Sequence, residues 1–446
     1  MKYRIREQNE LKPSGVEWLG DIPKKWQFTR LKYCFTYKKG KNPDIIFDEN
    51  FDNKLLPYLS TEYLRKGTNI QYVDNQNRNY LIANFGDILL LWDGANAGEF
   101  FISKEGIVSS TMALLKKINQ NDIDLFFKYF LKSIEKYLRS STTGMGIPHI
   151  NSQILNNLTL ILPNIVEQQK IANFLDEKSK IFDEAISKKE QLISKLELAK
   201  QSLISEVVTG KLKVLEQNSK LQTIKREENE LKSSGVEWLG DIPKDWKIHK
   251  LRYGVERIGD IDHDMPKSVS IGKPYLMTGD ISEKVSLIDF SNTKQISEED
   301  FLRLSRKIKP NKGDIIFARY ATIGTVCYVD VEKDFLVSYS CVTIKTIPKK
   351  VFGEYLFYFF KSNFFLEEIK SYINSNTQGN IGIDSLYKIK LILPKIEEQQ
   401  KISKYLDEKL IHFDNTIEKT KQSITKLKEA KEALISQAVT GKIEVL

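Results

Sequence analysis

Cysteine and histidine are scarce in this chain of 446 residues. It has three cysteines and four histidines. None of the cysteines, Cys34, Cys327 and Cys341, belongs to a Cys-x-x-Cys pair. Zinc sites and disulfide frameworks both need such residues in clusters or pairs, so neither is expected. Sparse, unpaired cysteines are typical of a reducing compartment, which predicts a cytoplasmic protein.

Long apolar runs are also missing. Residues 1–7 are polar and lack the apolar core of a signal peptide. No stretch approaches the roughly 18 apolar residues that a transmembrane helix requires. We therefore expect no membrane partner.

Motifs for catalysis are absent as well. There is no G-x-x-x-x-G-K-[ST] phosphate loop, no glycine-rich cofactor loop after a strand, and no Asn-Pro-Pro-Tyr or Asp-Pro-Pro-Tyr tetrapeptide. Pro43-Asp44 followed by Asp52-Asn53-Lys54 resembles a metal-nuclease pattern, but it is short and the second half of the chain lacks it. We expect this chain to be no enzyme and to bind no metal or cofactor.

Basic residues exceed acidic ones. The formal net charge is +9, which favours a polyanionic partner, most simply nucleic acid. A basic protein without such a partner would show the same balance, so charge alone does not decide. The length suggests two to four domains.

An internal repeat is the most informative feature. Residues 11–27 (LKPSGVEWLGDIPKKWQ) return as residues 231–247 (LKSSGVEWLGDIPKDWK), and 18 of 22 positions match from Arg6 and Arg226 onwards. A second block, residues 160–215, returns as residues 391–446 with 33 of 56 positions identical. Both copies of that block begin with LILP and end near a VTGK segment.

The stretches between the repeated blocks differ. The offset is 220 for the first block and 231 for the second, so residues 28–159 and 248–390 differ in length. They also share little sequence. A constant frame with variable middles is what a protein needs to recognise two different targets.

Each closing block predicts one long helix after a strand. Pro163 and Pro394 mark the break before it, and Gly210 and Gly441 stand where a helix C-cap belongs. Between them apolar residues recur at a spacing of three to four, as in a coiled coil. The simplest partner for each stripe is the other copy, in an antiparallel pair. The alternative is that each helix packs only on its own domain.

The variable regions combine strand-like and helix-like runs. The strand-like runs are Asp87–Trp92, Asp314–Ala318 and Leu336–Thr346, and the helix-like runs are Ile123–Leu138 and Val351–Ile373. We predict two α/β (α+β) domains with polar loops, related by an internal pseudo-twofold repeat. The predicted boundaries are residues 1–159 and 216–390 for the domains, and 160–215 and 391–446 for the helical spacers.

Polar loops at matching places are candidates for DNA contact. Hydroxyl, amide and basic side chains suit phosphates and base edges, although an ordinary surface loop has the same composition. In the first domain the candidates are Lys66, Arg78, Asn79, Trp92, Arg139, Ser140, Ser141, Thr142, Thr143, His149 and Asn151. In the second they are Arg303, Arg306, Arg319, Tyr320, Asn374, Asn376, Thr377, Gln378 and Asn380.

The whole arrangement resembles the specificity subunit of a type I restriction-modification system. The segments that carry the resemblance are SGVEWLGDIP-x-x-W, at Ser14–Trp26 and Ser234–Trp246, and LP-x-I-x-EQQKI-x-x-x-LDEK, at Pro163–Lys178 and Pro394–Lys409. With the V-T-G-K endings and the two variable regions, they span nearly the whole chain.

The resemblance implies a non-catalytic subunit with two target-recognition domains. Each domain would read one half of a bipartite site in double-stranded DNA. The helix pair would set the spacing and dock two modification (methyltransferase) subunits. S-adenosylmethionine, ATP and Mg would belong to those and to the restriction (translocase and nuclease) subunits.

Overall fold

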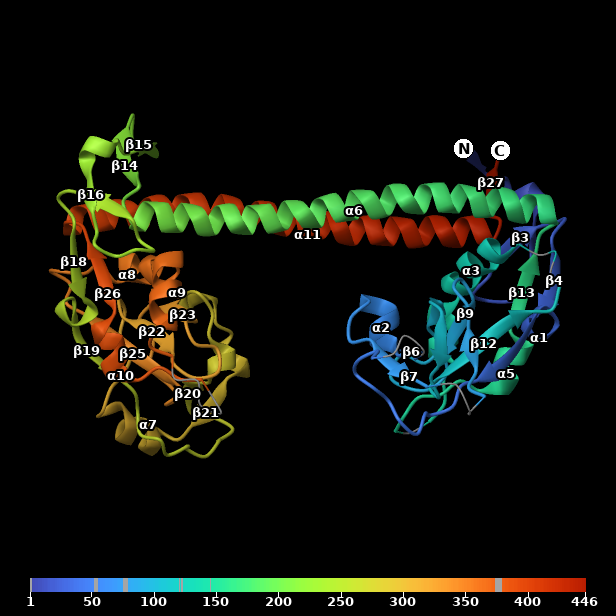
Figure 1. The fold of residues 1–446 in the computed structure, drawn as a ribbon, viewed down its shortest axis with the longest axis horizontal. Coiled ribbons are helices and arrows are strands. Elements are labelled where there is room, and N and C mark those ends of the chain that lie inside the picture. Colours follow the sequence, from blue (N-terminus) through green and yellow to red (C-terminus); the bar gives the residue numbers. More distant parts are fainter. Residues whose placement is uncertain are drawn as a thin grey trace. The chain divides into compact units, whose positions relative to one another are not determined.

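The chain folds into two compact units. The computed structural model describes residues 2–51, 55–74, 79–119, 121, 123–144, 146–373 and 379–446. The first unit is Met1–Lys189 with Gln422–Leu446, and the second is Glu190–Lys421. Each unit contains one α+β domain, a segment of one long helix and a segment of the other (Figure 1). The predicted fold of two similar domains joined by long helices is confirmed.

The domain of the first unit is built on two small sheets. One has the order β10-β9-β12-β5 and is antiparallel throughout, and the other has the order β7-β6-β11-β8 with β6 and β11 parallel. The strands are β1 (Tyr3–Ile5), β2 (Leu11–Pro13), β3 (Asp21–Pro23), β4 (Gln27–Arg30), β5 (Phe35–Lys39), β6 (Leu56–Leu59), β7 (Gln71–Val73), β8 (Ile82–Ala83), β9 (Ile88–Leu91), β10 (Phe100–Ile102), β11 (Gly106–Val108), β12 (Met112–Lys117), β13 (Thr159–Leu162) and β27 (Ile443–Val445). Its short helices are α1 (Leu31–Cys34), α2 (Thr61–Lys66), α3 (Asp124–Ser133), α4 (Glu135–Ser140) and α5 (Ser152–Asn157), with the 3-10 turn η1 (Gln8–Glu10).

The domain of the second unit repeats this plan. Its sheets have the orders β19-β25-β22-β23 and β21-β20-β24. The strands are β14 (Leu212–Gln217), β15 (Lys220–Lys225), β16 (Leu231–Ser233), β17 (Asp241–Pro243), β18 (Lys247–Lys250), β19 (Val255–Gly259), β20 (Lys273–Leu276), β21 (Lys294–Ile296), β22 (Ile315–Ala318), β23 (Val326–Tyr328), β24 (Leu336–Val337), β25 (Cys341–Thr346) and β26 (Lys390–Leu393). The helices are α7 (Glu298–Ser305), α8 (Gly353–Phe360), α9 (Asn363–Lys370) and α10 (Ile383–Lys388). The 3-10 turns are η2 (Glu228–Glu230), η3 (Leu251–Tyr253), η4 (Thr278–Asp280), η5 (Val285–Leu287) and η6 (Phe290–Asn292).

Three runs predicted as single elements are divided. Leu336–Thr346 forms β24 and β25, which belong to different sheets and are separated by residues 338–340. The helical run that includes Val351–Ile373 breaks between α8 and α9, where the Ser362 hydroxyl accepts a hydrogen bond from the Phe365 N–H and caps the second helix. The run Ile123–Leu138 likewise breaks at Ile134, between α3 and α4.

The two long helices are α6 (Ile165–Val208) and α11 (Ile396–Val439), each 44 residues long. They form the predicted antiparallel coiled coil. In the first unit Lys431 lies 2.7 Å from Asp183, and in the second Lys200 lies 2.6 Å from Asp414. These are the same ion pair in the two copies of the repeat, because Asp183 matches Asp414 and Lys200 matches Lys431.

The helices also pack on the domains, but the alternative that each helix packs only on its own domain is wrong, because the two helices pair with each other and each contributes to both cores. The hydrophobic core of the first unit contains residues from the start of α6, such as Phe174 and Leu175, and from the end of α11, such as Val439. The core of the second unit contains Leu406 from the start of α11 and Val208 from the end of α6. Each core therefore holds two helix ends from distant parts of the sequence.

The repeated Trp and Glu residues join each domain to its helix. In the first unit the Trp26 indole donates to Glu167 at 3.2 Å, and Arg6 lies 3.2 Å from the same carboxylate. The second unit repeats these contacts with Trp246, Arg226 and Glu398, at 3.0 and 2.9 Å. This shared network explains why these residues are identical in both copies.

The glycine of the repeated VTGK segment fits against the same tryptophan. Gly441 has φ +73°, and an added Cβ would lie 2.4 Å from Pro23 Cγ and 2.9 Å from the Trp26 ring. Gly210 has φ +77° and meets Pro243 and Trp246 in the same way. Both the backbone conformation and the close approach require glycine at the end of each helix.

Strand β27 pairs with β1 in the first unit, with Val445 opposite Tyr3. The second unit has a continuous hairpin, β14–β15, in the matching place, and its turn at Asn218 and Ser219 has positive φ angles. The first unit thus builds from two separate segments what the second builds from one.

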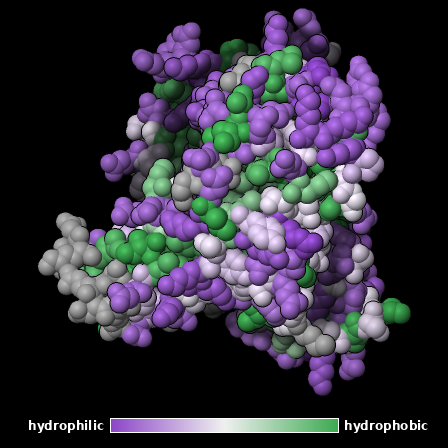
Figure 2. Space-filling view, turned by 90° about the vertical axis from the view of Figure 1, so that its right-hand side faces the viewer, coloured by the Kyte–Doolittle hydropathy of each residue, from purple (hydrophilic) through white to green (hydrophobic). Residues whose placement is uncertain are grey.

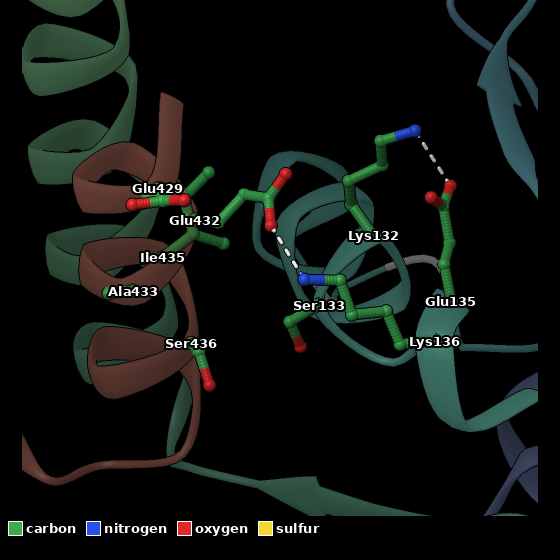
Figure 3. A pocket seen from close by; sticks show the side chains of 9 residues that line it. All are labelled: Lys132, Ser133, Glu135, Lys136, Glu429, Glu432, Ala433, Ile435 and Ser436. Carbon is green, nitrogen blue, oxygen red and sulfur yellow. Dashed lines mark hydrogen bonds and ion pairs between the residues drawn. The ribbon is translucent and has the colours of Figure 1, made fainter. Parts of the chain in front are cut away.

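The domains are fastened to the helices differently. In the second unit Gln201 of α6 donates to the Lys361 carbonyl and to Asn363, at 2.5 and 3.0 Å. In the first unit the matching junction of α3 and α4 with α11 is held by the exposed Lys136–Glu432 ion pair, 3.0 Å long, beside a cavity of about 380 Å³ (Figure 3).

The face shown in Figure 2 is mostly hydrophilic, with small scattered apolar groups. None of the helices in the described part of the chain combines the length and apolar character that a bilayer crossing needs.

Candidate nucleic-acid interface

A hairpin and a second loop meet at one end of the main sheet in the first unit. The β9–β10 hairpin loop contains Asp93 and Gly94, and Gly94 donates to the Pro148 carbonyl at 2.9 Å. Ile150 donates to the Trp92 carbonyl at 2.9 Å. These backbone bonds hold Pro148 and Ile150, which flank the predicted DNA contact His149, against the hairpin.

The second unit builds the same junction from different residues. Ile381 donates to the Arg319 carbonyl at 3.1 Å, and Tyr320 pairs with Asn380. Ala321 in this hairpin has φ +56°, which costs a non-glycine residue roughly 1 kcal/mol. The match to Gly94, φ +119°, indicates that the hairpin shape is the common element.

An ion pair joins the first strand of each sheet to this hairpin, and its polarity is reversed between the units. In the first unit Lys39 at the end of β5 lies 2.8 Å from Asp93. In the second, Asp260 after β19 lies 2.6 Å from Arg319. The strand register shows that Lys39 and Asp260 occupy equivalent positions. Lys39 lies opposite Ala113 of β12, which corresponds to Val342 of β25. Gly259 lies opposite the next residue of β25, Thr343, so Asp260 follows at the position equivalent to Lys39. One scaffold thus presents opposite charges at the same point.

Aromatic rings surround both ion pairs. Lys39 lies 5.5 Å from the Trp92 ring centroid, and Tyr37 packs on that ring at 5.2 Å. In the second unit Arg319 lies 4.5 Å from the Tyr320 centroid, and His263 stacks on Tyr339 at 4.7 Å. Rings beside cations are suited to contact bases as well as phosphates.

The interior behind the second junction carries uncharged titratable groups. Burial raises the pKa of the Cys341 thiol and of the Tyr275 hydroxyl to about 12 each. Because both groups are neutral near pH 7, the charge of this region comes from the loop residues.

Several first-domain candidates form side-chain hydrogen bonds with the backbone. The hydroxyls of Ser140, Ser141 and Thr142 donate to carbonyls of α4 at 2.7–2.9 Å. The Asn151 side chain accepts from the N–H groups of Gln153 and Ile154 and caps α5. The sequence pattern of this loop therefore reflects helix capping at least in part.

The other first-domain candidates are spread over the unit. Thr143 bonds to the exposed His149 at 3.1 Å, so these two lie together at the junction. Arg139 is half-buried and lies 3.5 Å from Glu99. Lys66, at the end of α2, is exposed beside Glu62, and Asn79 has φ +46°. Trp92 is buried.

In the second domain Arg319 is buried, Tyr320 and Asn380 lie at the junction, and Arg306 is exposed at the end of α7. Arg303 lies 2.8 Å from Asp300 and 3.1 Å from Asp264. Arg78, Asn374, Asn376, Thr377 and Gln378 lie outside the described residues, as does the Asp52–Lys54 part of the nuclease-like pattern.

Four residues of these junctions were not predicted from the sequence. They are Lys39, Asp93, Asp260 and Lys307. Lys38-Lys39-Gly40-Lys41 was a visible basic run, but the pairing of Asp260 with Arg319 joins positions 59 residues apart and leaves no local signal. Among the described residues no group of three or more His, Cys, Asp or Glu is placed to hold a metal ion.

Comparison with known proteins identifies the family. Residues 23–198 and 257–429 match the family described as "Type I restriction modification DNA specificity domain". The Type I restriction enzyme MjaVIII specificity subunit of Methanocaldococcus jannaschii is 31% identical over 456 residues, which cover 99% of this chain and 97% of the relative. The chain belongs to the type I restriction-modification specificity subunits.

More distant relatives agree. The Type I restriction enzyme EcoBI specificity subunit of Escherichia coli is 20% identical over 87% of this chain and 80% of its own length. A solved chain from a type I restriction-modification complex shares the fold, with a TM-score of 0.66 at 15% identity over 94% of this chain and 99% of that one. As a specificity subunit the chain carries DNA-recognition domains and is non-catalytic, and the predicted family is confirmed.

Proposed function

We propose that each domain reads one half of a bipartite site in double-stranded DNA. The observation that supports this most directly is the junction at the end of the main sheet. Both units place a hairpin and a second loop there on one scaffold, yet the side chains differ in charge and type. A scaffold kept constant under changing polar residues suits two different half-sites.

The proposed reading residues are those that meet at the junctions. In the first domain they are Asp93, Thr143 and His149, and in the second Tyr320 and Asn380. Asparagine pairs with adenine through two hydrogen bonds, and hydroxyl and imidazole groups contact base edges singly. The remaining basic candidates, Lys66 and Arg306 among them, suit phosphate contact.

A domain exchange tests this proposal. We would replace residues 28–159 with the corresponding region of another family member and map the methylated sites in cells that carry the matching partners. One half-site should change and the other should stay. A change in both halves, or in neither, would contradict separate reading by the two domains.

We propose further that the helix pair sets the distance between the half-sites. Inserting seven residues after Lys188, with a matching insertion in α11, lengthens each helix by about 10 Å, or about three base pairs of DNA. The spacer in the methylated motif should lengthen by one to a few base pairs. An unchanged spacer would mean that the helices do not determine it.

Two modification subunits, each docked on one copy of the repeated segment, are the proposed partners, and restriction subunits complete the complex. The EQQK motif supports this. Glu167 and Glu398 are fixed by tryptophan and arginine, and Gln168 and Gln399 are buried and bond to backbone on both sides.

The last two residues of that motif have no such explanation. Gln169, Lys170, Gln400 and Lys401 are all exposed, yet they are identical in both copies. Their retention is expected if two copies of one protein bind there. Lys170→Glu and Lys401→Glu should each lower the number of bound modification subunits from two to one, measured by native mass spectrometry.

Lys404→Glu is the control for these variants. Lys404 is exposed one turn from Lys401, but the other copy has Asn173 in its place. If the control lost a modification subunit as readily as Lys401→Glu, the repeated residues would have no special part in docking.

A further inference from the structure

An acidic loop follows β19 in the second domain. Asp260, Asp262 and Asp264 alternate with other residues directly after this strand. The matching positions of the first domain, residues 39–43, carry Lys39 and Lys41 instead, and the acidic residues Asp44, Asp48 and Glu49 come farther along that loop. Directly beside the candidate reading junctions, the matching positions of the two domains thus carry opposite charges.

The exposed carboxylates of this loop pair with basic residues at the end of α7. Asp262 lies 3.4 Å from Lys307, and Asp264 lies 3.1 Å from Arg303. The side chains of Asp262 and Asp264 are 55% and 68% exposed, and those of Lys307 and Arg303 are 41% and 43% exposed. All four charges therefore face solvent, where DNA phosphates would approach.

Folding stability does not account for these pairs. Exposed ion pairs stabilise a protein by roughly 0–1 kcal/mol. Asp260 differs, because it forms a buried pair with Arg319 in which both side chains are 9% exposed. Asp260 thus holds the hairpin in place, while Asp262 and Asp264 mainly alter the charge of the surface.

We propose that Asp262 and Asp264 form an electrostatic mask on the second domain. They neutralise Arg303 and Lys307 together with Asp300 and Asp260, which lie 2.8 Å and 3.5 Å from these cations, and they repel DNA phosphates, which weakens attachment through the backbone alone. The first domain, which has Lys39 and Lys41 at the matching positions, anchors DNA of any sequence. The second domain stays bound only at DNA sequences where it makes its base contacts. The complex therefore distinguishes DNA sites more through the second domain than through the first. This inference depends on the proposed DNA reading by both domains.

The test uses the complex with the modification subunits and duplexes that carry only the first or only the second half-site, once methylation mapping has defined them. The unaltered complex should bind the first-half duplex more tightly and with the steeper salt dependence. Asp262→Asn with Asp264→Asn should raise affinity for the second-half duplex about tenfold at low salt. It should also steepen the slope of log affinity against log salt, by less than about two, because Asp300 and Asp260 still pair with the two cations.

Two further variants make the result decisive. Asp334→Asn removes the same charge from an exposed aspartate that pairs with Lys309 and Lys273 elsewhere in the domain, and it should have little effect. An equal gain from this control, or no gain from the loop variant, would overturn the mask. Arg303→Gln with Lys307→Gln should cancel the gain.

The same arginine and lysine variant separates the mask from the proposed function. If the second domain does not bind DNA, Arg303→Gln with Lys307→Gln will leave the affinity of the unmasked complex unchanged. If the domain binds DNA but the loop is no mask, that variant will still weaken binding while the aspartate variants will not strengthen it.

Discussion

A partly buried carboxyl group in the second unit predicts a measurable pH dependence. Glu354 of α8 lies 3.2 Å from Lys284, which lies 2.8 Å from Asp407 of α11. Tyr358 donates to Asp407 at 2.5 Å. Burial and the neighbouring Asp407 raise the pKa of Glu354 to about 7. Burial opposes ionisation of Asp407, but hydrogen bonds from Glu354, Lys284 and Tyr358 outweigh it and lower the pKa of that carboxyl.

The sign of the effect follows from proton linkage. Between pH 4.5, the ordinary pKa of Glu354, and pH 7, the folded chain keeps a proton that the unfolded chain has lost. The free energy of unfolding therefore falls as pH rises through this window, by at most about 1.4 kcal/mol per pH unit. Because the proton is shared with Asp407 and the site is partly hydrated, we expect a total loss of about 1–2 kcal/mol. The lowered pKa of Asp407 acts only at lower pH.

Glu354→Gln should remove this dependence. The amide still donates to Asp407 but does not titrate, so the variant should match the unaltered chain near pH 4 and exceed its stability by about 1–2 kcal/mol at pH 8. Hydrogen exchange of the α8 amides, corrected for intrinsic rates, measures this locally. Helix α3 of the first unit is an internal control, since Leu125 stands in the matching place. Equal pH dependence of α8 in both proteins would refute the reasoning.

Three further predictions test the repeated framework. Gly441→Ala should destabilise the first unit and Gly210→Ala the second, each by more than about 2 kcal/mol, because the added Cβ meets proline at 2.4 Å in a left-handed conformation. Hydrogen exchange should localise each loss of stability to its own unit. Losses spread over both units, or no loss, would contradict this role of the two glycines. Arg226→Ala should lower the free energy of unfolding by about 3 kcal/mol in urea titrations, since it leaves the part-buried Glu398 without its arginine; a loss below 1 kcal/mol would show that Trp246 suffices. Lys431→Ala should lower the stability of the first unit by less than about 1 kcal/mol, because Asp183 is exposed. A double-mutant cycle with Asp183→Ala should give a coupling free energy of that size. A coupling free energy several times larger would mean that the ion pair is shielded from solvent.

Sequence patterns were sufficient for elements with a local cause. The absence of proline and glycine between Pro163 and Gly210 predicted α6, and the apolar runs after Asp87 and Asp314 predicted β9 and β22. The duplication predicted that the two units share one plan. These features depend on residues that are neighbours in the sequence, so they could be predicted without knowing which distant residues are in contact.

The candidate site depended on contacts between distant residues and was only partly predictable. Thr143, His149 and Asn380 do lie at loop junctions, but the hairpin partners of His149 and Asn380 are 56 and 60 residues away in the sequence. Arg319 has the sequence appearance of an exposed phosphate contact, yet Asp260 holds it in the interior. The hydroxyls of Ser140–Thr142 were explained by helix capping, a role that the composition of a loop does not distinguish from ligand contact.

The way the first unit is assembled bears on when it can fold. The second unit is one continuous stretch of chain, whereas the first needs Gln422–Leu446 in addition to Met1–Lys189. The ribosome makes those last residues after the entire second unit. The domain that is synthesised first therefore lacks Val439 and Val445 of its core until translation is almost complete. A premature stop near residue 421 would leave the second unit whole and disable the domain at the opposite end of the gene.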